Sequence, residues 1–280
     1  MSPAVDQITA PVAFHGESLI WDKCKSSFHW VDMMRGDVLT LDSRGDIERM
    51  HVGDVAAALR PRISGGLVVA VERGFAIVDN AGTIKILPQL WSDPGIRMND
   101  GACDPQGRFY CGSMSYGEEP GPGVMYRLDP DQSTSIVMRD LAISNGLTWL
   151  AAGSEAVFVD SLTQRIDVMG FNADEGTFHS RRTLVTIDGT DGMPDGITLD
   201  VEDGVWVAMW GGSAVHRYTR DGVLDAVVTF PVRDVTSCAL VDGYLYVSTS
   251  AKDDQDNPRA GALFRASVGV NGQDVREFAG

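Results

Sequence analysis

Six short apolar segments recur along the chain at intervals of 39 to 49 residues. Each is rich in aromatic and β-branched residues, the composition typical of buried strands. The segments begin at Phe28, Leu67, Arg108, Ala156, Val205 and Tyr244. A repeat of this length indicates an architecture in which each unit contributes one supersecondary element.

Each of these anchor segments is flanked by further strand-like runs, one before it and two after it. The unit is therefore four strands in about 40 to 45 residues, which is the period of a β-propeller blade. Six units predict an all-β, six-bladed propeller with four antiparallel strands per blade, formed by residues 1–280 as a single domain. A β-sandwich, the competing architecture, has no six-fold repeat of four runs.

Three local features of the repeat carry separate expectations. In the second unit the first strand is assigned to "RISGG" (62–66), and "DVAAALRP" (54–61) is expected to form one short turn of helix that Pro61 stops. In the sixth unit the last run is "DVREF" (274–278). Residues 10–15 ("APVAFH") are expected to pair with this unit, because an unclosed ring leaves exposed strand edges.

The composition argues against several classes of partner. Acidic residues outnumber basic ones by 39 to 23, and the net charge of −16 disfavours nucleic acid, since phosphate binding needs a basic face. No apolar run is long enough to span a membrane, and the first ten residues do not resemble a signal peptide. The four cysteines have no C-x-x-C spacing, so reduced structural thiols in a cytoplasm are the simplest account.

Four polar residues recur 9 to 11 positions before the anchors of four different units, namely Glu17, Asn99, Asn145 and Asp195. The first strand of a blade lies beside the central axis, so these side chains should converge there. Two carboxylates facing each other require a proton or a cation between them, and oxygen donors favour Ca²⁺, Mg²⁺ or Mn²⁺. The alternative is that the Asn-Gly and Asp-Gly pairs in "SNG", "NDG" and "PDG" simply form turns.

The stretch around Asn99 adds a second polar group. Arg97 and Asn99 are two residues apart and share one face of a strand, whereas Arg97 and Asp100 face opposite sides. Arg97, Asn99 and Asp100 are therefore candidates for the substrate-facing side of a metal centre. Other chemistry has less support, because the chain has no G-x-S-x-G elbow and its five histidines form no H-x-x-x-H or H-E-x-x-H pattern.

Several residues keep two interpretations. His15 is a packed or turn histidine, with a supporting place behind the metal ligands as the alternative. Trp210 either packs within its blade or lines the pocket. Tyr116 and Glu118 belong either to a lid or to a solvent-exposed loop. The run "KDDQDNPRAG" (252–261) lacks the glycine and the final glutamate of an EF-hand and is interpreted as a solvated loop.

These motifs, taken in order along the whole chain, resemble those of the regucalcin/gluconolactonase family, also called the senescence-marker-protein family. The matching runs are "GESLIWD", "RMNDGACDPQGRFYCGSMS", "ISNGLTWL", "PDGITLD" and "VWVAMWGG". The resemblance implies a six-bladed propeller with one divalent metal in its channel and, in many members, hydrolysis of sugar lactones. It implies that Glu17, Asn145 and Asp195 are metal ligands, and that Arg97 and Asn99 bind substrate oxygens, with Asn99 close to the metal.

The sequence departs from the family at Leu19, where members usually have proline, and the loop 115–123 cannot be aligned residue by residue. The expected cofactor is one divalent cation, calcium first, with Mg²⁺, Mn²⁺, Zn²⁺ or Fe²⁺ as alternatives. The native metal, the particular lactone and the oligomeric state stay open.

Three functions are consistent with these observations. The first is a metal-dependent lactonase that opens an aldonolactone such as gluconolactone, xylonolactone or arabinolactone, with Asp195 as both ligand and general base. The second is a phosphotriester or fluorophosphate hydrolase of related propeller type. The third is a calcium-binding propeller without catalytic turnover. The expected partner in the first case is a small-molecule lactone, with no nucleic acid and no membrane.

Overall fold

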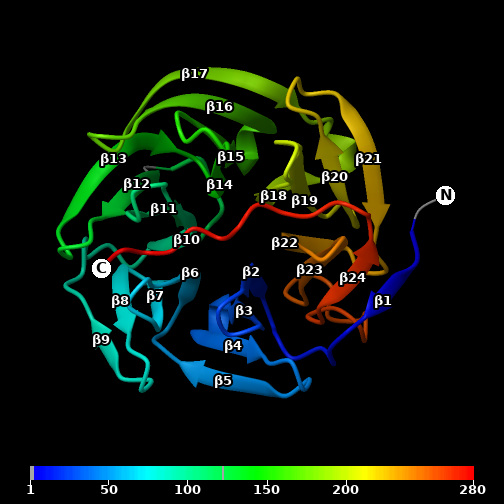
Figure 1. Cartoon of the computed structure of the whole chain (residues 1–280), viewed down its shortest axis with the longest axis horizontal. Coiled ribbons are helices and arrows are strands. Elements are labelled where there is room, and N and C mark those ends of the chain that lie inside the picture. The colour runs from blue at the N-terminus through cyan, green and yellow to red at the C-terminus, as the bar shows by residue number, and fades with distance from the viewer. Residues whose placement is uncertain (1–2, 122) are drawn as a thin grey trace.

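The computed structural model describes residues 3–121 and 123–280 and shows six four-stranded antiparallel sheets arranged in a ring (Figure 1). Each sheet is one blade, and the strand that lies nearest the centre of the ring is its inner strand. The prediction of a six-bladed propeller with four antiparallel strands per blade is confirmed. Among the described residues, no helix is long and apolar enough to cross a membrane.

Blades 1 to 3 are built from consecutive strands. Their bounds are β2 (Gly16–Asp22), β3 (Ser27–Asp32), β4 (Asp37–Leu41) and β5 (Ile47–His51); β6 (Ala56–Pro61), β7 (Leu67–Val71), β8 (Gly74–Val78) and β9 (Ile84–Ile86); and β10 (Ile96–Cys103), β11 (Phe109–Ser115), β12 (Gly123–Leu128) and β13 (Thr134–Leu141).

Blades 4 to 6 repeat the pattern, except that the sixth takes its outer strand from the N-terminus. Their bounds are β14 (Ser144–Trp149), β15 (Glu155–Asp160), β16 (Arg165–Asn172) and β17 (Thr177–Thr186); β18 (Met193–Leu199), β19 (Val205–Trp210), β20 (Ala214–Tyr218) and β21 (Leu224–Thr229); and β22 (Asp234–Val241), β23 (Tyr244–Ser250), β24 (Phe264–Ser267) and β1 (Val5–Gln7). Helical structure in the described residues consists of the 3₁₀ turns η1 (Met33–Arg35), η2 (Ser161–Thr163) and η3 (Gly189–Asp191).

The hydrophobic cores lie between neighbouring blades, because each twisted sheet packs its faces on the next. The second strands are consequently buried on both faces, and all six residues of β3 and all five of β7 are buried. The outer strands face solvent and carry few buried residues, as in β5, β13 and β21. This gradient explains why the second strands were the most visible anchors in the sequence.

The helical turn expected at 54–61 is wrong. This segment forms β6, the inner strand of blade 2, and Ala56 to Leu59 are completely buried. Burial between neighbouring blades outweighs the helix propensity of alanine, which is a weak preference. The run 62–66, assigned as the inner strand, is instead the β6–β7 turn, where Gly65 and Gly66 adopt left-handed φ values of 85° and 81°.

Ring closure joins the N-terminus to blade 6, as expected, but at a different strand. The pairing strand is β1, whose Val5 to Gln7 lie against β24. Residues of the predicted segment 10–15 add separate hydrogen bonds, from Ala13 N–H to the Gly261 carbonyl (3.2 Å) and from Ala251 N–H to the Phe14 carbonyl (2.9 Å). Because β1 occupies the outer position of blade 6, residues 274–278 cannot be its outer strand, and that assignment is wrong.

Residues 269–280, here called the C-terminal strap, instead cross the face of the ring and end near blades 2 and 3 (Figure 1). The strap bonds to every blade, and from blade 1 to blade 6 the partners are Lys23 with Asp274, Pro61 with Phe278, Gly107 with Ala279, Leu150 with Arg276, Leu199 with Gln273, and Gly243 with Asn271. Phe278 is completely buried in the core shared with β6, β7 and β11. The strap therefore ties opposite sides of the ring together.

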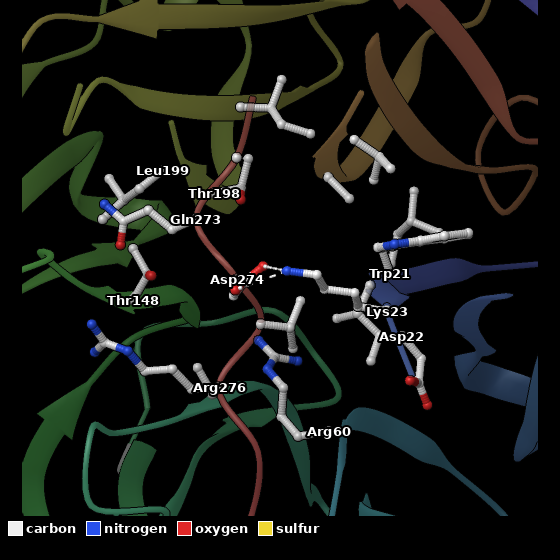
Figure 2. Close-up of a pocket in the computed structure, with 18 of the residues that line it drawn as sticks. Trp21, Asp22, Lys23, Arg60, Thr148, Thr198, Leu199, Gln273, Asp274 and Arg276 are labelled. Carbon is white, nitrogen blue, oxygen red and sulfur yellow. Dashed lines mark hydrogen bonds and ion pairs between the residues drawn. The ribbon is translucent and has the colours of Figure 1, made fainter. Parts of the chain in front are cut away.

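A wide cavity of about 1190 Å³ lies on the same face as the strap. Its walls come from the C-terminal ends of the inner strands and from strap residues (Figure 2). The Lys23 ammonium and the Asp274 carboxylate meet there at 3.2 Å, and both side chains are largely exposed. None of the predicted site residues lines this cavity, so the candidate chemistry lies at the other end of the inner strands.

Candidate active site at the opposite end of the inner strands

A second, small cavity of about 50 Å³ lies where the inner strands begin. Five residues predicted from the sequence line it together, namely Glu17, Arg97, Asn99, Asn145 and Asp195. They come from β2, β10, β14 and β18, which belong to blades 1, 3, 4 and 5. Residues spread over 179 positions of sequence are therefore brought to one place by the ring.

Four of these polar residues, Glu17, Asn99, Asn145 and Asp195, sit at an irregularity of their strands, whereas Arg97 pairs regularly with Met114. The pairing register shifts between Glu17 and Ile20 in β2, between Met98 and Gly101 in β10, between Ser144 and Leu147 in β14, and between Pro194 and Ile197 in β18. Such β-bulges turn a side chain away from the regular alternation and are common beside active sites. The bulges are thus the local features that aim these four groups at the ring axis.

The Asn-Gly and Asp-Gly pairs are therefore not turns, and that alternative is wrong. The glycines allow neighbouring inner strands to approach closely. A Cβ on Gly146 would lie 2.7 Å from the Asp195 carbonyl oxygen, and one on Gly196 would lie 2.7 Å from the Thr236 carbonyl oxygen. Both distances are below normal contact, so only glycine fits beside these polar residues.

Asn145 is held by a short chain of hydrogen bonds. Its Nδ2 donates to Ser161 Oγ at 3.0 Å, and Ser161 Oγ donates to the Pro194 carbonyl at 2.7 Å. Because the Ser161 proton is used by the carbonyl, the hydroxyl accepts from Asn145, which sets the orientation of the amide. The amide oxygen of Asn145 is consequently turned away from Ser161.

Two buried oxygens of this cavity, Asn145 Oδ1 and Asp195 Oδ1, have no hydrogen-bond partner among the described residues. Unpartnered acceptors in such a position are costly unless a ligand satisfies them. The Glu17 carboxylate lies in the same cavity, with His15 Nε2 3.8 Å from its Oε1. A hard divalent cation is the ligand that two carboxylates and an amide oxygen fit best.

The described residues contain no group of three His, Cys, Asp or Glu side chains that could hold a metal. The candidate set therefore depends on Asn145 as its third donor, which is an acceptable ligand for oxygen-preferring cations. Whether the three groups share one coordination sphere stays a prediction.

The two carboxylates destabilise each other's ionised forms. Burial raises the pKa of Glu17 to about 8, and the neighbouring Asp100 charge adds to the rise. Burial also raises the pKa of Asp195, followed by the charges of Glu17 and Asp100, and the nearby Asn145 amide opposes this rise. A bound cation would remove this repulsion and favour the ionised state of both groups.

Arg97 is buried beside these carboxylates without forming an ion pair among the described residues. Its Nη1 donates to Asn99 Oδ1 (2.6 Å), to the Met98 carbonyl (3.0 Å) and to Met33 Sδ (3.2 Å), while its Nε has no partner. Burial lowers the pKa of Arg97. The Tyr116 ring centre lies 5.8 Å from its guanidinium carbon. A charge left without a neutralising partner in a pocket is suited to an anionic or oxygen-rich ligand.

Asn99 and Asp100 lie differently from one another. Asn99 lines the cavity, but its oxygen accepts from Arg97 and its Nδ2 donates to the Ser144 carbonyl at 2.9 Å. Asp100 does not line the cavity, and its Oδ1 accepts from the backbone N–H of Gly101 at 2.7 Å. Burial raises the pKa of Asp100, and Arg60, which lines the strap-side cavity, opposes the rise. The structure therefore does not bring Asp100 together with Arg97 and Asn99.

The mouth of the cavity is lined by residues that the sequence left undecided or missed. His15 Nδ1 is 2.8 Å from Ser250 Oγ, and its ring meets the Trp210 ring edge-on at 5.5 Å. Burial lowers the pKa of His15 to about 3, with Arg97 and Lys252 contributing, so the imidazole is neutral. The run 252–261 forms a loop, as interpreted, and its first residue, Lys252, also lines the cavity. Nothing in its sequence surroundings indicated this, because its neighbours in the cavity are distant in sequence.

Leu19, which stands where the family usually has proline, makes a hydrogen bond that proline could not make. Its backbone N–H donates to Ser237 Oγ at 2.7 Å, and its side chain is buried. Proline has no N–H to donate. The departure therefore adds a contact between blades 1 and 6 and leaves Glu17 in the cavity.

Residues 15–251 match the family model described as the SMP-30/Gluconolactonase/LRE-like region. Regucalcin from Danio rerio is 30% identical over 279 residues, and the match covers 95% of each chain. A putative sugar lactone lactonase, YvrE, from Bacillus subtilis is 28% identical over 277 residues, again with 95% of each chain covered. The crystal structure of regucalcin from Agrobacterium tumefaciens, described as a calcium-binding protein, superposes with a TM-score of 0.91 at 25% identity and covers 99% of this chain and 97% of its own.

Proposed function

We propose, because the chain belongs to the SMP-30/gluconolactonase/LRE-like family, that it is a metal-dependent hydrolase that opens a sugar lactone to its aldonic acid. The observation that carries the proposal is the pair of unpartnered buried oxygens, Asn145 Oδ1 and Asp195 Oδ1, beside Glu17 and Arg97 in one cavity. The relative named as a putative sugar lactone lactonase supports the reaction class.

Glu17, Asn145 and Asp195 would hold the metal. Calcium is the first candidate, since the donors are all oxygen and the relatives include a regucalcin described as calcium-binding. When bound, a divalent cation supplies Lewis-acid polarisation of the lactone carbonyl.

The proton transfers fall to Asp195. Hydrolysis adds a water molecule to the carbonyl carbon and breaks the bond between that carbon and the ring oxygen, which leaves as a hydroxyl group. Asp195 is the candidate base that takes a proton from the attacking water and returns one to the ring oxygen. One oxygen of the Asp195 carboxylate would hold the cation, and the other would take the proton.

Arg97 and its neighbours would hold the substrate. The unpaired guanidinium can donate to ring hydroxyls and to the carboxylate of the product, and its bond to Asn99 sets its direction. Asn99 has one amide hydrogen beyond its bond to the Ser144 carbonyl, which would serve a second hydroxyl. The charged and amide groups of the cavity wall suit a hydroxylated ring better than an apolar ester.

The test is pH-stat hydrolysis of an aldonolactone panel by protein stripped with EDTA and reloaded with Ca²⁺, Mg²⁺, Mn²⁺, Zn²⁺ or Fe²⁺ one at a time. Activity should vanish on stripping and return with at least one metal. The Asp195→Asn variant should fold normally and lose at least about a hundred-fold in kcat, the lower range for a proton-transfer group. Asp131→Asn, in an exposed turn, is the matched control.

Two results would replace this function with another. Hydrolysis of phosphotriesters or fluorophosphates in preference to lactones would assign the second activity. Tight metal binding without hydrolysis of any lactone, ester or phosphotriester would assign a calcium-binding propeller without turnover. Full lactonase activity in the Asp195→Asn variant would remove the proposed role of this residue.

A further inference from the structure

The strap-side cavity, which the proposed function does not use, has the size and the walls of a ligand site. Its volume of about 1190 Å³ is sufficient for a small molecule, since pockets for such ligands measure roughly 300–1,000 Å³. Each of the six inner strands contributes an apolar residue to its wall, namely Leu19, Pro61, Ala102, Leu147, Ile197 and Ala239. These walls suit the apolar body of a ligand, so the polar groups of the cavity decide which apolar molecule fits.

Arg60 is a half-buried cation of this cavity that forms no ion pair among the described residues. It belongs to β6, and its side chain extends into the cavity (Figure 2). Its Nη1 donates to the Leu59 carbonyl at 2.6 Å and to Ser18 Oγ at 3.3 Å. Its Nε and Nη2 make no hydrogen bond to any described residue, and both stay accessible to water.

The unused edge of the Arg60 guanidinium has the geometry that recognises a carboxylate. The Nε–H and Nη2–H bonds of a guanidinium point in one direction and form a fork that matches the two oxygens of a carboxylate. Because Nη1 is already fixed to blade 2 and to Ser18 of blade 1, the side chain loses less conformational freedom when a ligand binds. A flexible surface arginine would not have this advantage.

Two of the carboxylates that line the cavity have cationic or imidazole neighbours of their own. Asp274 lies 3.2 Å from the Lys23 ammonium, and Asp22 Oδ2 lies 3.6 Å from His29 Nε2. Neither carboxylate contacts Arg60 within ion-pair distance in the described part of the chain. The Arg60 fork is therefore not occupied by these acidic groups.

The remaining charged residues of the wall limit how many negative charges a ligand can carry. Asp242 is exposed and Glu277 is half-buried, and both would repel additional anionic groups. Arg276, the other arginine of the wall, donates its Nη2 to the Leu150 carbonyl at 3.2 Å. One carboxylate on Arg60, with an uncharged remainder, is the arrangement that these neighbours favour.

We propose that the strap-side cavity binds a monocarboxylate with an apolar body, whose two carboxylate oxygens lie on the Nε and Nη2 edge of Arg60. The apolar residues of the inner strands would cover the body of this ligand. The site lies at the opposite end of the inner strands from Glu17 and Asp195, so it does not depend on the proposed lactonase function.

The first test is isothermal titration of the intact, calcium-loaded protein with octanoate, acetate and octanamide. Octanoate should bind to one site per chain. Acetate lacks the apolar body and octanamide lacks the charge, so each should bind at least about ten-fold more weakly. Absence of octanoate binding, or equal affinity for octanoate and octanamide, would overturn the proposal, and Arg60 would then serve only as a charge near Asp100.

The second test changes the fork and compares it with another cation of the same cavity. Arg60→Gln should weaken octanoate binding by about 10- to 100-fold, the effect of lost charge-assisted hydrogen bonds, and Arg60→Lys should recover only part of it because lysine has no fork. Lys23→Gln removes the same charge from an exposed position and should change the affinity by less than about five-fold. Equal losses in Arg60→Gln and Lys23→Gln would show a general attraction and would overturn the site.

The third test leaves Arg60 intact, so it decides the proposal even if the Arg60 variants do not fold. Glu277→Gln removes a repelling charge and should strengthen octanoate binding. Thr198→Phe narrows the wall at a half-buried position and should weaken octanoate more than acetate. Arg97→Ala should leave octanoate affinity unchanged. A loss in Arg97→Ala together with full affinity in Thr198→Phe would place octanoate in the candidate active site and overturn the proposal.

Discussion

Replacing Ser161 by alanine should weaken metal binding without touching any candidate ligand. The Ser161 hydroxyl accepts from Asn145 Nδ2 at 3.0 Å and donates to the Pro194 carbonyl at 2.7 Å. Without it, the Asn145 amide can rotate and present its nitrogen to the cation. The donor set would then lose its amide oxygen for part of the time.

The magnitude follows from both broken bonds. Losing a partner that orients a metal ligand typically costs about 10- to 100-fold in metal affinity. That range corresponds to about 1.4 to 2.7 kcal/mol. The Pro194 carbonyl would also lose its donor, which should reduce the free energy of unfolding by about 1–3 kcal/mol. The fold should survive, because this loss is a fraction of the stability of an ordinary domain.

The assay is isothermal titration of EDTA-stripped protein with Ca²⁺ and with Mn²⁺, at one pH and ionic strength. Thr163→Val is the matched control, because the Thr163 hydroxyl donates to the Asp160 carbonyl at 2.7 Å in the same 3₁₀ turn and does not contact Asn145. The control should lose stability but keep its metal affinity. Unchanged metal affinity in Ser161→Ala, or an equal loss in both variants, would refute the orienting role.

Three further predictions concern the substrate, the fold and the pH dependence. Arg97→Ala should raise KM and so lower kcat/KM for hydroxylated lactones by roughly one to two decades, because a charge-assisted hydrogen bond of about 1.5–3 kcal/mol is lost. Metal affinity should stay nearly unchanged, and loss of the metal or of the fold would show that Arg97 is structural. Phe278→Ala should lower the free energy of unfolding by about 3–5 kcal/mol in calorimetry, since the phenyl side chain is fully buried. A melting temperature equal to that of the unmodified protein would contradict the role of the strap in holding the blades together. Burial raises the pKa of Glu17 to about 8 from its ordinary 4.5, so the metal-free folded chain keeps a proton that the unfolded chain loses between these values. As pH increases from about 4.5 to about 8, the free energy of unfolding of the metal-free protein should therefore fall and the metal affinity should rise. A metal affinity that does not change with pH would contradict the assignment of Glu17 as a metal ligand.

The sequence could predict the propeller because its repeat is local. Each second strand is buried on both faces, so apolar runs recur once per blade and remain visible without any knowledge of contacts. Where a strand carried no such run, prediction failed. The inner strand of blade 2 consists largely of small alanines, which fit the crowded centre of the ring but have the composition of a helix.

The polar residues were also found by position, although their local structure was not. Matching offsets in four units placed Glu17, Asn99, Asn145 and Asp195 at one level of the ring. The same dipeptides that produce turns elsewhere are β-bulges here, because an adjacent inner strand leaves no room for a Cβ on Gly146 or Gly196. A dipeptide cannot distinguish these cases, since the neighbouring strand lies in another blade.

The sequence alone determined the number of blades, the four-strand repeat and the level at which the polar groups gather, because these depend on periodicity along the chain. Only the tertiary structure decided how the groups are oriented and enclosed. The orientation of Asn145 depends on Ser161, part of the cavity wall on the contact between Glu118 and Lys252, and the far face on a strap that contacts all six blades. Most of these contacts join residues that are far apart in the chain, and their geometry is set by the closure of the ring, which no local pattern encodes.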